Sequence, residues 1–359
     1  MTEIKHKNPK LMNWFDTELP VNPVHVLYHG YHAPVRYEIL KHFLLAEHDD
    51  ERLIQTEQDV KTAQRRVSLL LTLERIVRNI DKFEKSREEE MLIKLASIMK
   101  ELRFYHCNRK MNAIRNALAF LIRFQKADGS FPVSLPANVF IIDTILDYGI
   151  VTNTYMEKAL KWLLSLQNTD KGWGATTAGH SDIWLTIKVL HTFSYNIKYI
   201  RNTKIKKGVD FVLSHLYAEN TGGVFQGKEA WELYAQNYNF DNFFYGGILG
   251  VLEMLSRLNT GYEDTRIHAL LRALIARQMR SGHWPSQSYD LPACRSDERV
   301  TMRVVRVLKL FYIMPMGGSA TIKSVRIKQS GRTSAKKPAF VLDPINNPKP
   351  EITGTDENE

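Results

Sequence analysis

The chain has 359 residues, of which 44% are apolar and 25% charged, a balance typical of a globular protein with a sizeable buried core. The net charge of +10 permits anionic partners such as nucleic acid, a diphosphate, an acidic glycan or anionic lipid, although a solvated surface with a basic tail also explains it. No apolar run reaches about 18 residues, so we expect no membrane span.

The N-terminus and the cysteines predict a cellular compartment. The opening stretch, MTEIKHKNPKLMNWF, lacks the apolar core of a secretory signal. The two cysteines, Cys107 and Cys294, give neither a disulfide framework nor a CxxC metal pair. We therefore expect a reduced, cytoplasmic protein.

The first third of the chain divides into three segments. Residues 1–34 are predicted to be irregular because their prolines interrupt a helix. Residues 35–48 have apolar side chains at helical spacing, and residues 51–106 are charged, helical and almost free of glycine and proline. In this last segment one stripe is predicted to be buried: Val67, Leu70, Leu71, Leu73, Ile76, Val77 and Ile80.

A repeat occupies residues 112–312. An apolar helix ends in Gln and is followed by a polar turn, Gly and a large aromatic residue, and the chain does this three times. The copies are LAFLIRFQKADGSFP (118–132), LKWLLSLQNTDKGWG (160–174) and LRALIARQMRSGHWP (271–285). A degenerate copy at 209–225 has Leu216 in place of Gln. The intervals of about 40 to 60 residues leave room for two helices per unit.

A second, more apolar helix follows each turn. These helices are predicted at 139–150, 181–194, 240–255 and 296–311. Asp182, Asp241 and Asp297 begin three of them, where a carboxylate caps free N–H groups. Four residues later come Thr186, Tyr245 and Thr301, and we place Thr144 in the same column of the first copy, in which Phe140 replaces the Asp.

These patterns predict an all-α fold. Helices that are apolar around most of their circumference form the inner layer, and the more charged Gln-ending helices form the outer layer. A ring of such pairs gives an α/α barrel, and an open solenoid is the alternative. The repeat domain is predicted to span residues 35–316, and residues 317–359 are predicted to be a disordered tail that begins basic and ends acidic.

The Gln, Gly and aromatic pattern resembles the QW-type repeat of terpene cyclases and protein prenyltransferase β-subunits. VRYEILKHFLLAEHDDERL (35–53) is also similar to the N-terminal helix of bacterial stand-alone proteins with prenyltransferase and squalene-cyclase repeats. The resemblance covers roughly residues 35–312 and implies an α/α toroid with a central cavity. It also implies that Gln167 bonds the start of the next helix, that Gly172 allows a positive φ, and that Trp173 packs between neighbouring pairs. In the alternative, Trp173 or Trp284 faces a ligand.

The catalytic motifs of that superfamily are not found. The chain contains no DxDD acid motif, and HDDERL (48–53) does not fit the DDxxD magnesium motif. Asp290 and Cys294, with His283 or His180, offer the three protein ligands of a catalytic zinc site, but their spacing departs from that of prenyltransferases. A free buried cysteine is the alternative, so zinc or magnesium stays open as a cofactor.

Three loops are predicted to line one mouth of the barrel: 176–184, 231–247 and 288–298. We take as candidate catalytic residues Asp182, Asp241, Asp297, His180 and Tyr238. Candidate ligand-binding residues are Trp184, Trp231, Asn237, Tyr245 and Tyr289. In the alternative interpretation each Asp only caps a helix and the aromatic residues belong to the core.

Three functions are compatible with these residues. The first is binding or conversion of an isoprenoid or similar apolar molecule, which the resemblance implies and which predicts a greasy, aromatic-lined interior. The second is a non-catalytic interaction scaffold, and the third is a glycan lyase or hydrolase with an open polar cleft around Tyr238 and His180. Basic residues cluster at 197–208 and recur at Arg299, Arg303 and Arg306, but we do not expect a nucleic-acid partner.

Overall fold

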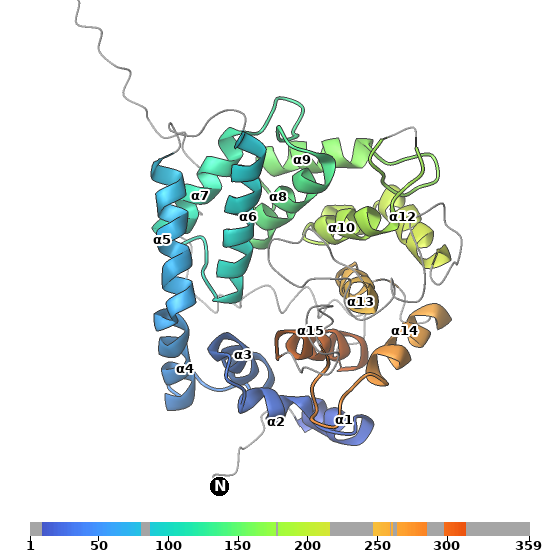
Figure 1. Cartoon of the computed structure of the whole chain (residues 1–359). Helices are drawn as coiled ribbons and strands as arrows, with labels where there is room; N and C mark the ends of the chain where they lie inside the picture. Colours follow the sequence, from blue (N-terminus) through green and yellow to red (C-terminus); the bar gives the residue numbers. More distant parts are fainter. Residues whose placement is uncertain are drawn as a thin grey trace, which may run out of the picture. The chain divides into compact units, whose positions relative to one another are not determined.

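The computed structural model describes residues 9–79, 87–176, 179–215, 247–258, 260, 264–285 and 298–313 (Figure 1). The chain separates into two compact units, Met1–Gly318 and Ser319–Glu359, and every described residue belongs to the first. Within these ranges the regular structure is helical, with no strand apart from an isolated bridge between Trp173 and Asp182. The predicted all-α fold is therefore confirmed. None of the described helices is long and apolar enough to cross a membrane.

The helices before the repeats are α1 (Pro9–Glu18), α2 (Pro23–Tyr28), α3 (Ala33–Glu38), the π-helix η1 (Ile39–Phe43), α4 (Glu51–Thr62), α5 (Gln64–Arg78) and α6 (Glu88–Phe104). Those of the repeats are α7 (Asn112–Arg123), α8 (Leu135–Asp147), α9 (Thr154–Ser165), α10 (Ile183–Phe193), α11 (Ile197–Ile200), α12 (Thr203–Ser214), α13 (Gly247–Arg257), α14 (Thr265–Ile275), α15 (Glu298–Leu308) and the π-helix η5 (Lys309–Ile313).

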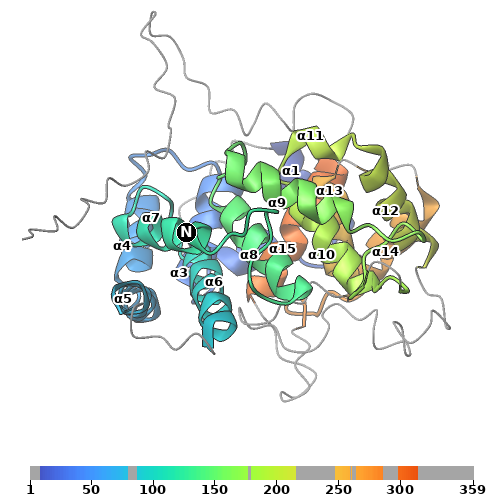
Figure 2. The same ribbon diagram turned by 90° about the horizontal axis from the view of Figure 1, so that it is seen from above.

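The second helices of the pairs form a connected series. Helix α6 contacts α8, α8 contacts α10, α10 contacts α13, and α13 contacts α15 (Figure 1; Figure 2). The first helices of the pairs pack on this series, because α9 contacts α8, α12 contacts α10 and α14 contacts α13. Residues 137–146 of α8 and 185–193 of α10 are buried, as expected for helices that are apolar all round. We call α6, α8, α10, α13 and α15 the inner helices.

The N-terminal segment differs from its prediction. Residues 1–34 were expected to be irregular, but α1 and α2 lie within them. Pro9 and Pro23 are the first residues of these helices, and Pro34 lies in the first turn of α3. Proline is tolerated in the first turn, because the N–H that it lacks has no helical partner there. The prolines therefore start helices that they were expected to break.

The charged segment 51–106 is also less regular than predicted. It forms α4, α5 and α6, with a break at Ala63 between the first two helices. Leu73 and Ile76 of the predicted stripe are buried, but Val67 is 42% exposed and Leu71 58% exposed. Ile80 lies outside the described residues. The buried face of α5 is thus rotated from the predicted one.

Candidate functional site

The glutamines at the repeat turns are structural, as predicted. Each side-chain amide donates to a carbonyl of its own turn and to a second carbonyl distant in the sequence, which lies at the start of a later helix for Gln125 and Gln167 and just before α2 for Gln278. Gln125 bonds Gly129 O and Tyr155 O, both at 2.9 Å, and Gln167 bonds Lys171 O and Lys204 O, both at 2.8 Å. Gln278 does the same with Gly282 O at 3.1 Å and Val21 O at 2.7 Å.

The aromatic residues of the turns are core residues. Trp173 and Trp284 are 0% exposed and Phe131 is 1% exposed. The indole N–H of Trp173 donates to Leu163 O, and that of Trp284 donates to Leu274 O. The alternative in which Trp173 or Trp284 faces a ligand is therefore wrong.

The turns also correct the alignment of the predicted repeat. The backbone N–H of Trp173 donates to Thr186 Oγ1, and that of Trp284 donates to Thr301 Oγ1. In the first copy the equivalent acceptor is Asn138 Oδ1, at 2.6 Å from Phe131 N, so Asn138 occupies the column that we assigned to Thr144.

Glycine provides the positive φ in only two of the three turns. Gly129 and Gly282 have φ values of 101° and 82°, whereas in the second turn Lys171 has the positive φ of 79°. A Cβ on Gly172 would lie 2.5 Å from Ser181 Cβ, so this glycine is required by close packing and not by its φ.

The predicted site residues around α10 have separate roles. The carboxylate of Asp182 accepts the backbone N–H of Leu185 at 2.9 Å and caps the helix. His180 and Asp182 are exposed, and Trp184 is partly buried against the core. The capping role of Asp182 is confirmed, and the structure shows no contact that joins these three side chains into one catalytic group within the described ranges.

Most of the other candidates lie outside the described residues. These are Asp241, Asp297, Tyr238, Trp231, Asn237, Tyr245, Tyr289, Asp290 and Cys294. Of the proposed zinc ligands, His283 is described and half-buried, with Nδ1 at 3.3 Å from Ser281 Oγ. No group of three metal-ligating side chains occurs in the described part of the chain. The zinc site therefore stays a prediction.

Two of the arginines predicted along the last inner helix, Arg303 and Arg306, pair with carboxylates of other helices. Arg303 pairs with Glu253 of α13, and Arg306 pairs with Glu38 of α3 at 2.7 Å. Glu38 also lies 3.3 Å from His106, which follows α6. Burial would raise the pKa of Glu38, but Arg306 and the neighbouring histidines lower it to about 2. These contacts link the last inner helix to the N-terminal segment.

A charged network on the inner helices was missed by sequence reasoning. At its centre, Asp143 of α8 accepts from Lys100 Nζ of α6 at 2.5 Å and lies 2.8 Å from Nδ1 of His191 on α10. Asp143 is 1% and His191 4% exposed. Lys100 also lies 3.3 Å from Asp147, one turn further along α8. Three successive inner helices are thus joined by charged hydrogen bonds.

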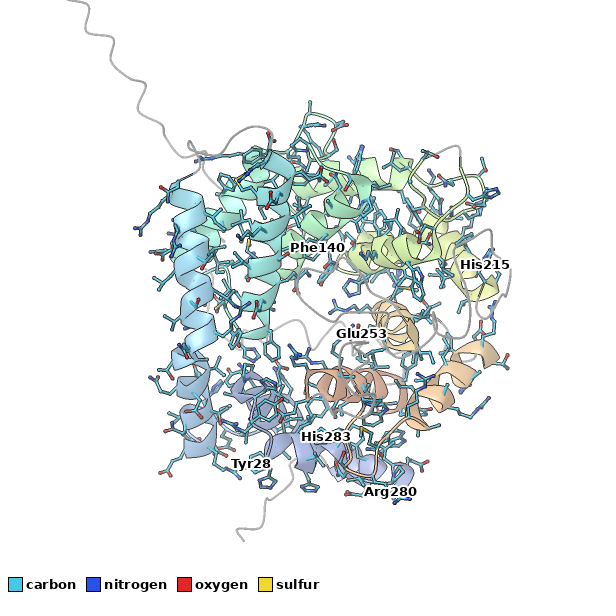
Figure 3. All side chains as sticks on the ribbon, viewed as in Figure 1. Tyr28, Phe140, His215, Glu253, Arg280 and His283 are labelled. Carbon is cyan, nitrogen blue, oxygen red and sulfur yellow. The ribbon has the colours of Figure 1, made fainter. Side chains whose placement is uncertain are left out.

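The network continues onto α13 and α15. Arg303 donates Nε to Glu253 Oε1 at 2.7 Å and Nη2 to Glu253 Oε2, a bidentate pair (Figure 3 labels Glu253 on α13). One turn beyond Glu253, the guanidinium of Arg257 lies 4.9 Å from the centre of the Tyr195 ring. Tyr195 in turn contacts His191 edge-on at 5.5 Å. These side chains come from all five inner helices or directly follow one of them. We call them the inner-helix network: Lys100, Asp143, Asp147, His191, Tyr195, Glu253, Arg257 and Arg303.

The pKa values in the network follow from burial and from these partners. Burial would raise the pKa of Asp143, but Lys100 and His191 outweigh it and hold the carboxyl ionised. Burial lowers the pKa of His191, against the effect of Asp143, so the imidazole is neutral at pH 7. Burial also lowers the pKa of Lys188, one turn before His191, from 10.5 to about 7. Such perturbed groups gather at functional sites more often than elsewhere.

A pattern in the sequence marks this network. Polar residues interrupt the apolar inner helices at helical spacing: Asp143 and Asp147 on α8, Glu253 and Arg257 on α13. On α10, Trp184, Lys188 and His191 follow one another at intervals of three or four residues and share one face, and Tyr195 comes just after the end of the helix. Polar residues in register on otherwise buried helices are the signal that sequence reasoning did not use.

Comparison with known proteins gives no further assignment. No protein-family model matches the sequence, and no curated protein matches it.

Proposed function

We propose that the chain is an α/α toroid of the prenyltransferase and squalene-cyclase repeat type. The order of helix contacts supports this arrangement. The series of inner helices ends at α15, which contacts α2 and α3, and His106 at the end of α6 hydrogen-bonds Pro34 O of α3 at 3.2 Å. In an open solenoid the first and last repeats contact only their own neighbours. Contacts that return from the last inner helix to the N-terminal segment, and from that segment to the end of α6, favour a ring.

The proposed function is binding of an isoprenoid or similar apolar molecule that carries an anionic group. The inner-helix network is the observation that carries it. Glu253 is 17% and Arg303 16% exposed, and Arg257 is exposed, although they stand on helices whose other described residues are mostly buried. Solvent, and therefore a small molecule that carries a charged group, can reach these side chains.

The charges of the network indicate that the ligand carries an anionic group. Its cations outnumber its carboxylates, since Lys100, Arg103, Arg257, Arg303 and Lys188 face Asp143, Asp147 and Glu253. A purely apolar molecule would desolvate these groups without compensation. An anionic group, by contrast, would pair with Arg257, which has Glu253, Asp147 and Asp143 as charged neighbours but forms no ion pair with a carboxylate of the described ranges. Trp184 of α10 and Tyr195, just beyond the end of that helix, supply aromatic surface for the rest of the ligand.

The test is binding of farnesyl diphosphate, farnesol and inorganic diphosphate to the purified full-length chain, measured by calorimetry. We expect farnesyl diphosphate to bind more tightly than either half of the molecule alone. Arg257→Gln should weaken it about tenfold or more, because a charged hydrogen bond contributes roughly 1.5–3 kcal/mol. Arg201→Gln, an exposed position after α11, is the matched control. Binding of none of the three compounds would favour the scaffold alternative.

A glycan-active toroid is the second candidate, and one observation favours it. The network contains the residue types that such enzymes need: a histidine held by a carboxylate, a tyrosine, and arginines that can neutralise an acidic sugar. Binding of an oligogalacturonate, and not of farnesyl diphosphate, would support this candidate. Mass spectrometry of a solvent extract of the protein provides an independent distinction, because only the first candidate predicts a co-purifying lipid.

A further inference from the structure

Exposed lysines and arginines dominate the outer surface of the segment that contains α9, α11 and α12. Helices α9 and α12 pack on the inner helices α8 and α10, so their exposed side chains lie on the outer wall of the repeats. Of the acidic residues at 154–165 and 196–214, which the structure describes in full, Glu157 is half-buried and Asp210 is exposed. We call this surface the basic face, and its exposed cations, apart from Lys198, are Lys158, Lys161, Arg201, Lys204, Lys206 and Lys207.

Contacts between the helices join the basic face into one surface. Gln167, just after α9, donates to Lys204 O at the start of α12 at 2.8 Å, and Lys204 Nζ donates to Leu164 O of α9 at 3.3 Å. Lys198 of α11 pairs with Glu157 of α9 at 2.8 Å. Because this pair already neutralises Glu157, the remaining cations give the basic face a strongly positive potential.

Two exposed apolar side chains lie within the basic face. Ile197 is 51% and Tyr155 48% exposed, and they are the large apolar side chains that are exposed in the described part of residues 112–313. Asn196 donates to Val151 O at 3.4 Å, and Lys198, on the other side of Ile197, pairs with α9, so Ile197 lies beside the segment that carries Tyr155 (Figure 2). The outer helices α7 and α14 also carry exposed arginines, but none of their large apolar side chains is exposed.

We propose that the basic face docks on a membrane surface that contains anionic lipids. The lysines and the arginine lie at the level of the lipid phosphates, and Ile197 and Tyr155 enter the boundary between headgroups and acyl chains. Tyrosine is enriched at this boundary, because its ring is apolar and its hydroxyl stays hydrated. The exposed isoleucine favours a lipid over a nucleic acid, since a phosphate backbone offers it no apolar surroundings.

This docking surface is separate from the inner-helix network. None of its residues belongs to the network, so the inference does not depend on the ligand proposed above. Each basic residue close to an anionic bilayer strengthens binding by about fivefold. Exposed charges are screened over about 8 Å at physiological ionic strength, so we expect reversible binding that weakens as salt is added.

The experiment is sedimentation of the full-length protein with vesicles. One set contains equal amounts of phosphatidylcholine and phosphatidylserine, and the other contains phosphatidylcholine alone. We expect tight binding to the mixed vesicles only. The double variant Lys161→Gln and Lys207→Gln should bind them roughly fivefold more weakly for each charge removed. Its matched control, Arg75→Gln and Lys110→Gln, removes two exposed charges elsewhere and should retain the wild-type affinity.

A further variant separates the apolar contribution from the electrostatic one. Ile197→Ser should weaken binding to mixed vesicles without changing its dependence on salt, whereas the lysine variant should reduce that dependence. Binding that is independent of phosphatidylserine, an equal loss in the control, or no binding by the wild type overturns the inference. Tighter binding to a mixed-sequence DNA duplex than to mixed vesicles also overturns it. These variants should bind farnesyl diphosphate as the wild type does, so failure of the docking proposal leaves the proposed function standing.

Discussion

Replacing Lys188 with methionine is expected to increase the stability of the protein near neutral pH. The lysine is 5% exposed, and burial lowers its pKa from 10.5 to about 7 in spite of the opposing effects of Asp182 and Asp143. In the unfolded chain the usual pKa is restored. At roughly 1.4 kcal/mol per pKa unit, the gap between the two states corresponds to about 5 kcal/mol. Methionine keeps the length of the side chain without its charge, and we expect a gain of about 2–5 kcal/mol.

The sign of the pH dependence follows from the same gap. Between pH about 7 and about 10.5 the unfolded lysine binds a proton that the folded lysine does not. Stability from this group therefore rises with pH across that window and is lowest below it. The advantage of Lys188→Met should be largest at and below pH 7 and should vanish near pH 10.5. Urea denaturation of both proteins at several pH values measures it.

The matched control is Lys161→Met, at an exposed position of α9, which should change stability little at any pH. A Lys188→Met variant that is less stable than wild type near pH 7 would refute the reasoning, because it would show that the charged amine contributes more through its partners than burial removes. A constant difference between the two proteins across the pH window would refute it equally.

Three further predictions concern the repeat turns and the N-terminal segment. Gln278→Leu removes the hydrogen bond to Val21 O and should destabilise the protein by about 1–3 kcal/mol in urea denaturation. Asp182→Ala removes a helix cap and should lower the free energy of unfolding by about 1 kcal/mol, with no change in ligand affinity. A large loss of affinity would show instead that Asp182 contacts the ligand. The pKa of Glu38 is lowered to about 2, mainly by Arg306 against burial, so its contribution is present above pH about 4.5 and is lost as pH falls toward 2. The difference of about 3 kcal/mol between wild type and Glu38→Gln, measured by calorimetry, should shrink over that range.

The features that the sequence predicted correctly are those set by neighbouring residues. A glutamine lies four residues before the carbonyl that it bonds, as in Gln125 and Gly129, and this local pattern can be recognised from the sequence alone. The cap of α10 by Asp182 is equally local. The length and apolar character of α8 and α10 follow from periodicity alone. Each of these depends on a few adjacent residues, so the printed sequence contains the whole of the information.

The inner-helix network depends instead on how separate helices are rotated against one another. Lys100, Asp143 and His191 are each single polar residues in an apolar stretch. Taken one at a time, each indicates only an isolated polar residue on a buried helix. Their hydrogen bonds join residues about 45 positions apart, which is about one repeat. The repeat therefore brings them together, but only an alignment with Asn138, and not Thr144, in the Thr186 column gives the correct register.

The same argument explains the N-terminal segment, whose prolines suggested an irregular extension. Gln125 and Gln167 each bond a carbonyl at the start of the first helix of the next pair, Tyr155 in α9 and Lys204 in α12. Gln278 belongs to the last repeat and bonds Val21, just before α2. The N-terminal segment thus occupies the place that a further outer helix would take, although it lies at the other end of the chain. A pattern of neighbouring residues cannot predict this contact between distant parts of the chain, whereas the proposed ring of repeats requires it.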